Sequence, residues 1–337
     1  MSSNGKTIRC AVLGYGAAFN MGKGHSDWMN EAPGMEAVAA CDIDPPRMEA
    51  AKKDFPHFRT YPHVSKMLED KDIDLVVVIT PHNTHAELAI QCLNAGKHVV
   101  VEKPMCLKVA EATAMIEAAK KNNVVLTTFH NRRHDGDYLA VKEVIDKGLI
   151  GDVFHLEAYM GGYGKPGTWW RSDKAISGGA FYDWGAHVVD WVLNFMPEKM
   201  ESITGFFHDR VWFEATNEDQ VQAIIRFKSG AMADIQMSSI ARVGKPRFRI
   251  LGTKGGIIVE SFKEPFQVNT EVDGIPVNME LKFKQSNWPA YYANLAKTIL
   301  EGAPLEVTPE SSRRVIAVME TAEKSSKSGK AEPVPYE

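Results

Sequence analysis

The stretch Ile8-Arg-Cys-Ala-Val-Leu-Gly-Tyr-Gly16 decides the fold of the first part of this chain. A short, mostly apolar run is typical of a strand that is covered on both faces of a sheet. The Gly-x-Gly that follows permits a tight turn, in which backbone amides can approach a pyrophosphate at the start of a helix. Gly14, Tyr15 and Gly16 therefore predict a dinucleotide-binding turn, although a Gly-x-Gly alone also fits an ordinary strand-to-helix turn.

The same pattern of strand and helix continues after this turn. Apolar runs at residues 36–41, 75–80, 98–101 and 124–128 alternate with stretches of helical spacing at 83–95 and 109–122. Strands that alternate with helices indicate parallel pairing through helical crossovers. We therefore predict an α/β fold whose first domain, residues 1–128, is a doubly wound parallel sheet.

The pattern changes in the second half, which we assign as residues 129–337. After a helix predicted at 132–147, residues alternate between apolar and polar in several short runs separated by glycine-containing turns. This indicates an α+β domain with a largely antiparallel sheet. The late helices are predicted at 289–301 and 309–324, and the polar tail from 325 to 337 is expected to be loosely held.

Two positions refine the predicted nucleotide site. Phe19 stands where the fingerprint has its third glycine, but Gly22 follows three residues later, which indicates a three-residue insertion before the helix. Asp42 lies at the end of the second strand, where a carboxylate binds ribose hydroxyls and repels a 2′-phosphate. This favours NAD over NADP. A turn or cap role for Asp42 is the alternative, and Arg47 nearby keeps NADP open.

Two further motifs carry residues suited to acid–base chemistry. Lys103, in Glu102-Lys103-Pro104, follows a strand at the edge where parallel sheets bind ligands, and it can stabilise a developing alkoxide. Asp183 and His187 are four residues apart, so on a helix the carboxylate could orient the imidazole. A surface lysine is the alternative for Lys103, and we interpret Asp190 as structural.

Together these motifs resemble the Gfo/Idh/MocA oxidoreductase family over nearly the whole chain. The resemblance rests on Gly14-Tyr-Gly16, Asp42, the run Thr80-Pro-His-Asn-Thr-His85, Glu102-Lys-Pro104, and Gly178-Gly179 leading to Asp183 and His187. It implies a Rossmann dinucleotide-binding first domain and an open-faced second sheet that often forms the subunit interface. We expect a homodimer or homotetramer, because the apolar residues of that open face need cover. The resemblance also implies catalysis by Lys103, Asp183 and His187, and cofactor contacts from Thr80, Pro81, Asn83, His85, Glu102 and Lys103.

The family implies hydride transfer between a nicotinamide and a secondary alcohol or ketone of a sugar, sugar derivative or cyclitol. Two alternatives remain open: a redox-neutral enzyme that cleaves glycosides with retained NAD, and a nucleotide-sensing regulator without activity. The substrate side is predicted from the aromatic, glycine-rich stretch at residues 159–173, because aromatic faces stack on sugar rings. We expect substrate contacts from Tyr163, Trp169, Arg171 and Arg132, beside Lys103, Asp183 and His187. Simple packing is the alternative for the tryptophans.

Composition excludes other classes of protein. The chain has 337 residues and a formal net charge of −4, without a basic cluster or a long apolar run, so we expect neither nucleic-acid nor membrane binding. Its four cysteines lack paired spacing, and we expect a cytoplasmic enzyme without disulfides. The pairs His82 with His85 and His130 with His134 lack a third ligand in a known pattern, so we predict no metal site.

Overall fold

The computed structural model describes residues 7–337, which fall into two compact units. The first unit joins the chain up to Asn131 with Trp288–Arg313, and the second joins Arg132–Asn287 with Arg314–Glu337. This division departs from the predicted ranges 1–128 and 129–337. The reason is the helix α9 (Pro289–Glu301), which returns from the end of the chain to complete the core of the first unit.

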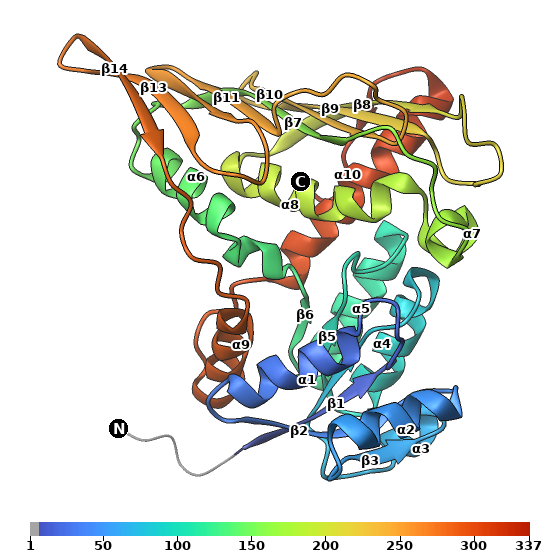
Figure 1. The fold of residues 1–337 in the computed structure, drawn as a ribbon. Coiled ribbons are helices and arrows are strands. Elements are labelled where there is room, and N and C mark those ends of the chain that lie inside the picture. The colour runs from blue at the N-terminus through green and yellow to red at the C-terminus, as the bar shows by residue number, and fades with distance from the viewer. Residues whose placement is uncertain (1–6) are drawn as a thin grey trace. The chain divides into compact units, whose positions relative to one another are not determined.

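The first unit is built on a parallel sheet of six strands in the order β3-β2-β1-β4-β5-β6 (Figure 1). This order is the Rossmann arrangement, which confirms the predicted fold. The strands are β1 (Ile8–Leu13), β2 (Met35–Cys41), β3 (Arg59–Tyr61), β4 (Leu75–Val78), β5 (His98–Val101) and β6 (Leu126–Thr128).

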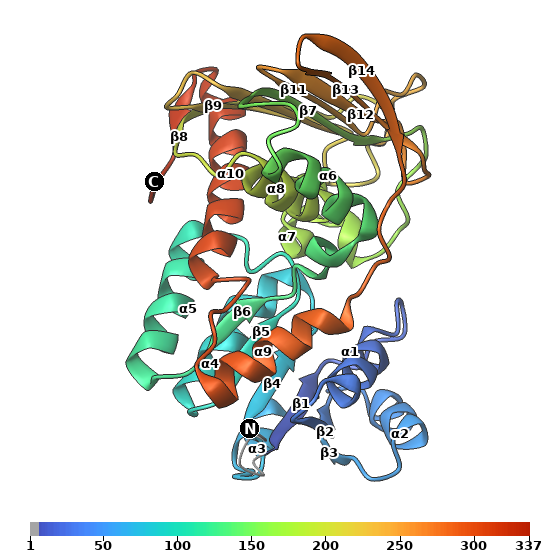
Figure 2. The same ribbon diagram turned by 90° about the vertical axis from the view of Figure 1, so that its left-hand side faces the viewer.

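Helices cover both faces of this sheet and explain its apolar strands. They are α1 (Met21–Glu31), α2 (Pro45–Asp54), α3 (Val64–Leu68), α4 (His85–Asn94), α5 (Val109–Asn122) and α9, with a short 3₁₀ turn η1 at His82–Thr84. Figure 2 shows α9 beside α1. The helix α9 buries Tyr291, Tyr292 and Leu295, and the Tyr291 and Thr127 hydroxyls are 3.0 Å apart.

The second unit is built on a sheet of nine strands in the order β14-β13-β12-β11-β7-β10-β9-β8-β15. All its pairs are antiparallel except β7 with β10, which confirms a mostly antiparallel sheet. The strands are β7 (Val153–Gly161), β8 (Met200–His208), β9 (Gln220–Phe227), β10 (Met232–Ser238), β11 (Phe248–Gly252), β12 (Gly255–Val259), β13 (Phe266–Val272), β14 (Ile275–Leu281) and β15 (Glu332–Pro333).

The helices of the second unit lie against one face of this sheet and leave the other face open (Figure 1). They are α6 (Gly136–Asp146), α7 (Lys174–Ser177), α8 (Trp184–Phe195) and most of α10 (Pro309–Ser328), preceded by a 3₁₀ turn η2 at Asn131–His134. The helix α10 comes so close to β8 that a side chain at Gly205 would collide with the backbone of Ala322.

The C-terminal tail contradicts its prediction as a loose segment. The helix α10 extends to Ser328, and β15 pairs with β8 at the edge of the sheet. Glu337 then accepts hydrogen bonds from Arg314 Nε at 2.7 Å and from the backbone amide of Met200 at 2.9 Å. The polar composition was misleading because these residues bond to an arginine and to a strand edge that lie far away in the sequence.

Candidate functional site

The turn after β1 has the shape that a pyrophosphate needs. Gly14 has φ +105° and donates its backbone N–H to Cys41 O at 2.8 Å, and a Cβ there would meet Ile79 O at 2.5 Å. Only glycine tolerates this conformation and this contact. At Gly16 a Cβ would have no atom within 4 Å, so the backbone of this residue borders open space. The turn therefore fits a dinucleotide that approaches the main chain closely.

Gly22 permits the close packing for which the fingerprint has its third glycine. The helix α1 begins at Met21, directly after the inserted residues, and a Cβ at Gly22 would meet the Tyr15 ring at 2.5 Å. The side chain of Tyr15 is 3% exposed and its hydroxyl donates to Asp54 at 2.9 Å. Tyr15 thus supports the turn with its ring, which the motif alone did not indicate.

Asp42 ties this turn to the end of β2. One carboxylate oxygen accepts the backbone N–H of Tyr15 at 2.7 Å, and the other accepts that of Asp44 at 2.9 Å. The turn role considered for Asp42 is therefore real, and each oxygen keeps a lone pair for a ribose hydroxyl. Arg47, which left NADP open, lies 3.6 Å from the Asp44 carboxylate.

The residues after β4 and β5 form one hydrogen-bonded group. The Thr84 hydroxyl donates to Thr80 Oγ1 at 2.7 Å. His85 is fully buried, with Nδ1 2.8 Å from Pro104 O and Nε2 2.8 Å from Thr80 O. Because carbonyl oxygens only accept, both contacts are hydrogen bonds only when both ring nitrogens carry a proton. His85 thereby joins the Thr80-Pro81-Asn83 segment to the turn of Glu102 and Lys103.

In the second unit, the Gly178-Gly179 pair allows the chain to enter α8 at a sharp angle. Both glycines have positive φ, +88° and +117°. A Cβ at Gly179 would meet Glu218 Oε2 at 2.7 Å, and this carboxylate accepts the backbone N–H of Ala180 at 3.1 Å. The glycines therefore let Glu218 hold the turn that leads to Asp183.

Asp183 lies at the N-cap of α8 and is held by an arginine. Because α8 begins at Trp184 and Asp183 has non-helical angles, the predicted placement of Asp183 and His187 within one helix starts a residue too early. Arg171 Nη1 donates to Asp183 Oδ1 at 2.9 Å, and its guanidinium stacks on the Trp169 and Trp170 rings at 5.4 and 4.5 Å. The predicted substrate residue Arg171 thus joins Trp169 to Asp183.

His187 stands between two tryptophans and is 6% exposed. Its ring lies 5.7 Å from that of Trp184 and 6.3 Å from that of Trp191. The Arg132 guanidinium stacks on the Trp184 ring, at 4.6 Å from its centroid. Trp184 was missed by sequence reasoning, although its position three residues before His187 on the helix could have revealed it.

Asp190 and Arg133 form a buried, bidentate ion pair with distances of 2.9 and 2.6 Å. This supports the structural interpretation of Asp190. Tyr163 has other contacts: its ring centroid lies 5.4 Å from that of Trp212, and the Arg242 guanidinium lies over the Tyr163 ring at 3.6 Å. Nothing in the local sequence pointed to Arg242, because the pair joins two loops about 80 residues apart.

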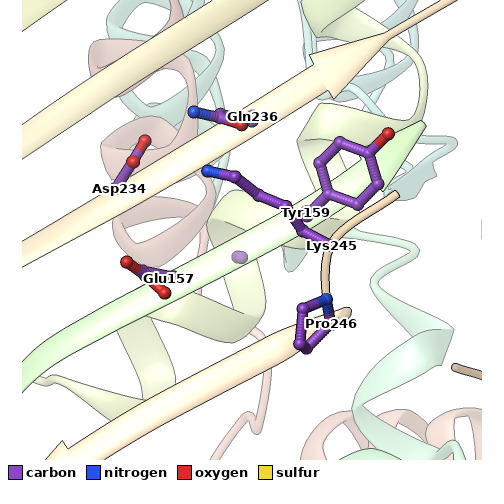
Figure 3. A pocket seen from close by; sticks show the side chains of 7 residues that line it. Glu157, Tyr159, Asp234, Gln236, Lys245 and Pro246 are labelled. Atoms are coloured by element: carbon purple, nitrogen blue, oxygen red, sulfur yellow. The ribbon is translucent and has the colours of Figure 1, made fainter. Parts of the chain in front are cut away.

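A separate hollow lies on the open face of the second sheet (Figure 3). Its side chains alternate with the buried residues of β7 and β10, and Lys245 extends across it toward Asp234. Burial raises the pKa of Asp234, which accepts two hydrogen bonds from Gln222. Of the stretch 159–173 predicted for the substrate side, the lining includes Tyr159 alone. The hollow is lined by Glu157, Ala158, Tyr159, Asp234, Gln236, Lys245 and Pro246.

The predicted site residues therefore divide between the units. All the predicted cofactor residues and Lys103 belong to the first, and Arg132, Tyr163, Trp169, Arg171, Asp183 and His187 belong to the second. Over residues 7–337, no three His, Cys, Asp or Glu side chains gather as a metal ion would require. In that same range, no helix is long and apolar enough to cross a bilayer.

Comparison with known proteins decides the family. The model of an oxidoreductase family with an NAD-binding Rossmann fold, GFO/IDH/MocA, matches residues 8–130, and that of the GFO/IDH/MocA C-terminal domain matches residues 138–258. The chain belongs to the Gfo/Idh/MocA oxidoreductase family. It is accordingly an NAD(P)-dependent dehydrogenase or reductase, as the motifs predicted.

Relatives within the family match almost end to end. Myo-inositol 2-dehydrogenase of Thermotoga maritima is 29% identical, over 94% of this chain and 96% of the relative. The NADP⁺-dependent scyllo-inositol 2-dehydrogenase IolW of Bacillus subtilis is 28% identical, over 95% and 94%. The structure of an NAD-binding protein from Listeria innocua superimposes with a TM-score of 0.87 at 27% identity, covering 98% of each chain.

Proposed function

We propose that this Gfo/Idh/MocA protein oxidises a secondary hydroxyl of a cyclitol or sugar, or reduces the corresponding ketone. The observation that carries the proposal is His187, a nearly buried imidazole between two tryptophans, four residues after a carboxylate that an arginine holds. Such a histidine has the proton-transfer chemistry that alcohol oxidation needs. Two full-length relatives are inositol dehydrogenases, which supports a cyclitol as the first substrate to test.

The cofactor we propose is NAD in preference to NADP. The nicotinamide, when bound, supplies the acceptor for the hydride of the reacting carbon. The turn at Gly14 and Gly16 would hold the pyrophosphate, and Asp42 would accept the ribose hydroxyls while its charge repels a 2′-phosphate. Cofactor contacts at the nicotinamide end are proposed for a second group of residues, because they all follow the ends of β4 and β5. They are Thr80, Pro81, Asn83, His85 and Glu102.

In the chemical step, His187 removes the hydroxyl proton and Lys103 stabilises the negative charge that develops on the oxygen. Asp183 orients the histidine and stabilises its protonated form. Because Arg171 donates a hydrogen bond to Asp183, the carboxylate keeps a fixed direction at the start of α8. In the reverse reaction the same groups return the proton.

The substrate contacts are proposed from the aromatic and basic groups around Asp183 and His187. Trp169 is 38% exposed and offers an apolar face to a ring, while Arg171 and Arg132 can donate to ring hydroxyls. Tyr163, 43% exposed, is proposed as a more distant contact.

The test is a screen of the purified protein with myo-inositol, scyllo-inositol, sugars, sugar acids and glycosides, each with NAD⁺ and with NADP⁺. Absorbance at 340 nm and product formation are followed in parallel. We expect reduced cofactor to accumulate with one substrate class and faster with NAD⁺. Glycoside cleavage or a keto product without such absorbance would instead indicate a redox-neutral enzyme, and binding of NADH without any turnover would indicate a regulator.

We further propose a cytoplasmic homodimer or homotetramer. The second sheet has helices on one face only, and its open face exposes apolar side chains such as Phe206, 44% exposed, among polar ones. The four cysteines are buried, as is usual for thiols in a reducing compartment. Sedimentation showing a monomer at micromolar concentration would contradict the proposed assembly.

A further inference from the structure

A fully buried histidine in the first unit has both ring nitrogens bonded, and the proposed chemistry does not use it. His25 lies on α1, and its side chain is 0% exposed. Its Nε2 is 3.0 Å from Glu102 Oε1, and its Nδ1 is 2.6 Å from the Tyr292 hydroxyl. The Phe129 ring covers its face, with the ring centroids 4.3 Å apart. A buried polar side chain held at this many points has one orientation.

The hydrogen bonds of this group have a definite direction. A carboxylate only accepts, so His25 Nε2 carries the proton and donates to Glu102. The other oxygen of the same carboxylate, Oε2, accepts the backbone N–H of Lys103 at 2.9 Å. In the neutral ring, Nδ1 then accepts a hydrogen bond from the Tyr292 hydroxyl. The result is an unbroken chain from Tyr292 through His25 and Glu102 to the main chain of Lys103.

This chain keeps a carboxylate charged where burial opposes charge. The Glu102 side chain is 14% exposed, and burial by itself would raise the pKa of its carboxyl. The hydrogen bonds from His25 and from the Lys103 amide, together with the charge of Lys103, lower that pKa below its usual value. Glu102 can therefore hold the Lys103 amide as an ionised acceptor, which gives a stronger hydrogen bond than a neutral one.

We propose that His25 is a positioning residue for Lys103. It acts through Glu102, by fixing the carboxylate that binds the Lys103 amide, and it thereby fixes the direction in which the lysine side chain leaves the turn. The helix α1 that carries His25 begins at Met21, next to the dinucleotide turn, so the same helix serves the pyrophosphate and the lysine. The catalytic consequence rests on the proposed role of Lys103; the ordering of the turn does not.

Two amide variants separate the two contacts of His25. In His25→Gln the side-chain amide extends as far as Nε2 and can still donate to Glu102. In His25→Asn the amide ends near the place of Nδ1 and loses Glu102, while it can keep Tyr292. Met29→Ala is the matched control, because Met29 is 0% exposed one turn further along the same helix and belongs to the same core. It lowers stability without touching Glu102.

The first readout is hydrogen exchange at the Lys103 amide, which needs no substrate. We expect His25→Asn to raise the exchange rate of the Lys103 amide. This increase should be at least tenfold greater than the increase at the amides of β1 and β4 in the same variant. In His25→Gln the exchange rate of the Lys103 amide should stay within about threefold of wild type. Met29→Ala should raise the exchange rates of the Lys103, β1 and β4 amides by a similar factor. If His25→Asn leaves Lys103 exchange unchanged, or if the control raises it equally, His25 does not position the turn.

The second readout is turnover with the substrate identified in the screen, or with myo-inositol and NAD⁺. We expect His25→Asn to lower kcat about 10- to 100-fold with NADH affinity, measured by fluorescence, changed less than threefold, and His25→Gln to restore most of kcat. A wild-type protein without turnover, combined with the expected exchange result, would reject the proposed function and keep the positioning role. Normal kcat in His25→Asn would reject the catalytic consequence.

Discussion

The two units hold their functional groups in different ways. In the first, the residues proposed to bind the cofactor follow parallel strands, and much of the proposed binding surface is main chain at Gly14 and Gly16. In the second, the groups are side chains on a turn and a helix start, held by bonds such as Arg171 to Asp183. A backbone site depends on local sequence, whereas a side-chain site depends on segments that meet only in the folded unit.

This difference suggests a division of work that variants can test. Cofactor affinity should depend on the first unit and proton transfer on the second, so a change in either unit should affect one property and spare the other.

Replacement of His187 should have the largest effect. His187→Ala removes the proposed base, and turnover should fall on the order of 10² to 10⁴-fold, the usual contribution of general acid–base catalysis. NADH affinity, measured by fluorescence titration, should stay within about twofold of wild type because His187 lies in the second unit. Equal losses of turnover and NADH affinity would break the proposed division, and unchanged turnover would remove His187 from its role.

The reverse experiment uses two glycines of one turn. In Gly16→Ala the new methyl group enters open space where the pyrophosphate is proposed to lie, so NADH affinity should fall roughly tenfold or more while the melting temperature stays unchanged.

Gly14→Ala is the matched control for that variant. It should unfold more easily, by about 2–4 kcal/mol, because φ is +105° and the methyl group meets Ile79 O. Thermal melting distinguishes the two variants, and a destabilised Gly16→Ala would show that the space beside Gly16 is structural.

Asp42 tests which dinucleotide the first unit selects. Asp42→Ser removes the charge and keeps an oxygen that can accept the Tyr15 amide. We expect the preference for NAD⁺ over NADP⁺, measured as the ratio of kcat/KM, to fall by about tenfold, equivalent to about 1.4 kcal/mol. If the ratio does not change, the carboxylate serves the turn alone, and the choice of cofactor lies elsewhere in the first unit.

Glu337 tests the dependence of the second unit on distant contacts. Glu337→Gln weakens the paired hydrogen bonds to Arg314, which measure 2.7 and 3.0 Å, and should lower the free energy of unfolding by about 1 kcal/mol. NADH affinity should not change. Denaturant unfolding gives the measurement, and a variant as stable as wild type would mean that the tail contributes little.

Sequence predicted most of the fold, and its errors have physical causes. The strands Ile8–Leu13 and His98–Val101 and the helix Val109–Asn122 lie where periodicity placed them. The strand Gly255–Val259 is not among the segments that the sequence predicts, because it begins with two glycines, which are typical of a turn. A Cβ at Gly255 would meet Asn269 O at 2.2 Å, so this glycine serves the close approach of β13, not a turn.

For the site, the motifs identified which residues to examine but not how they are held. Gly14 and Gly16 could be interpreted locally because the role proposed for them belongs to the main chain. The hydrogen bond between His25 and Tyr292 could not be predicted from local sequence. The same holds for the contacts of Arg171 with Trp169 and Asp183, because each contact depends on where separate segments meet. His25 and Tyr292 are 267 residues apart, and no local periodicity encodes such a pair.

The return of α9 to the first unit has a consequence for biosynthesis. The core of this unit includes Tyr291, Tyr292 and Leu295, but Arg132–Asn287 must be translated before they emerge. At about 5–20 residues per second, the ribosome makes that intervening segment in roughly 8–30 seconds. During this interval the nascent first unit exposes the apolar surface that α9 will cover. Its folding can finish only late in translation, and until then it is a natural client for chaperones.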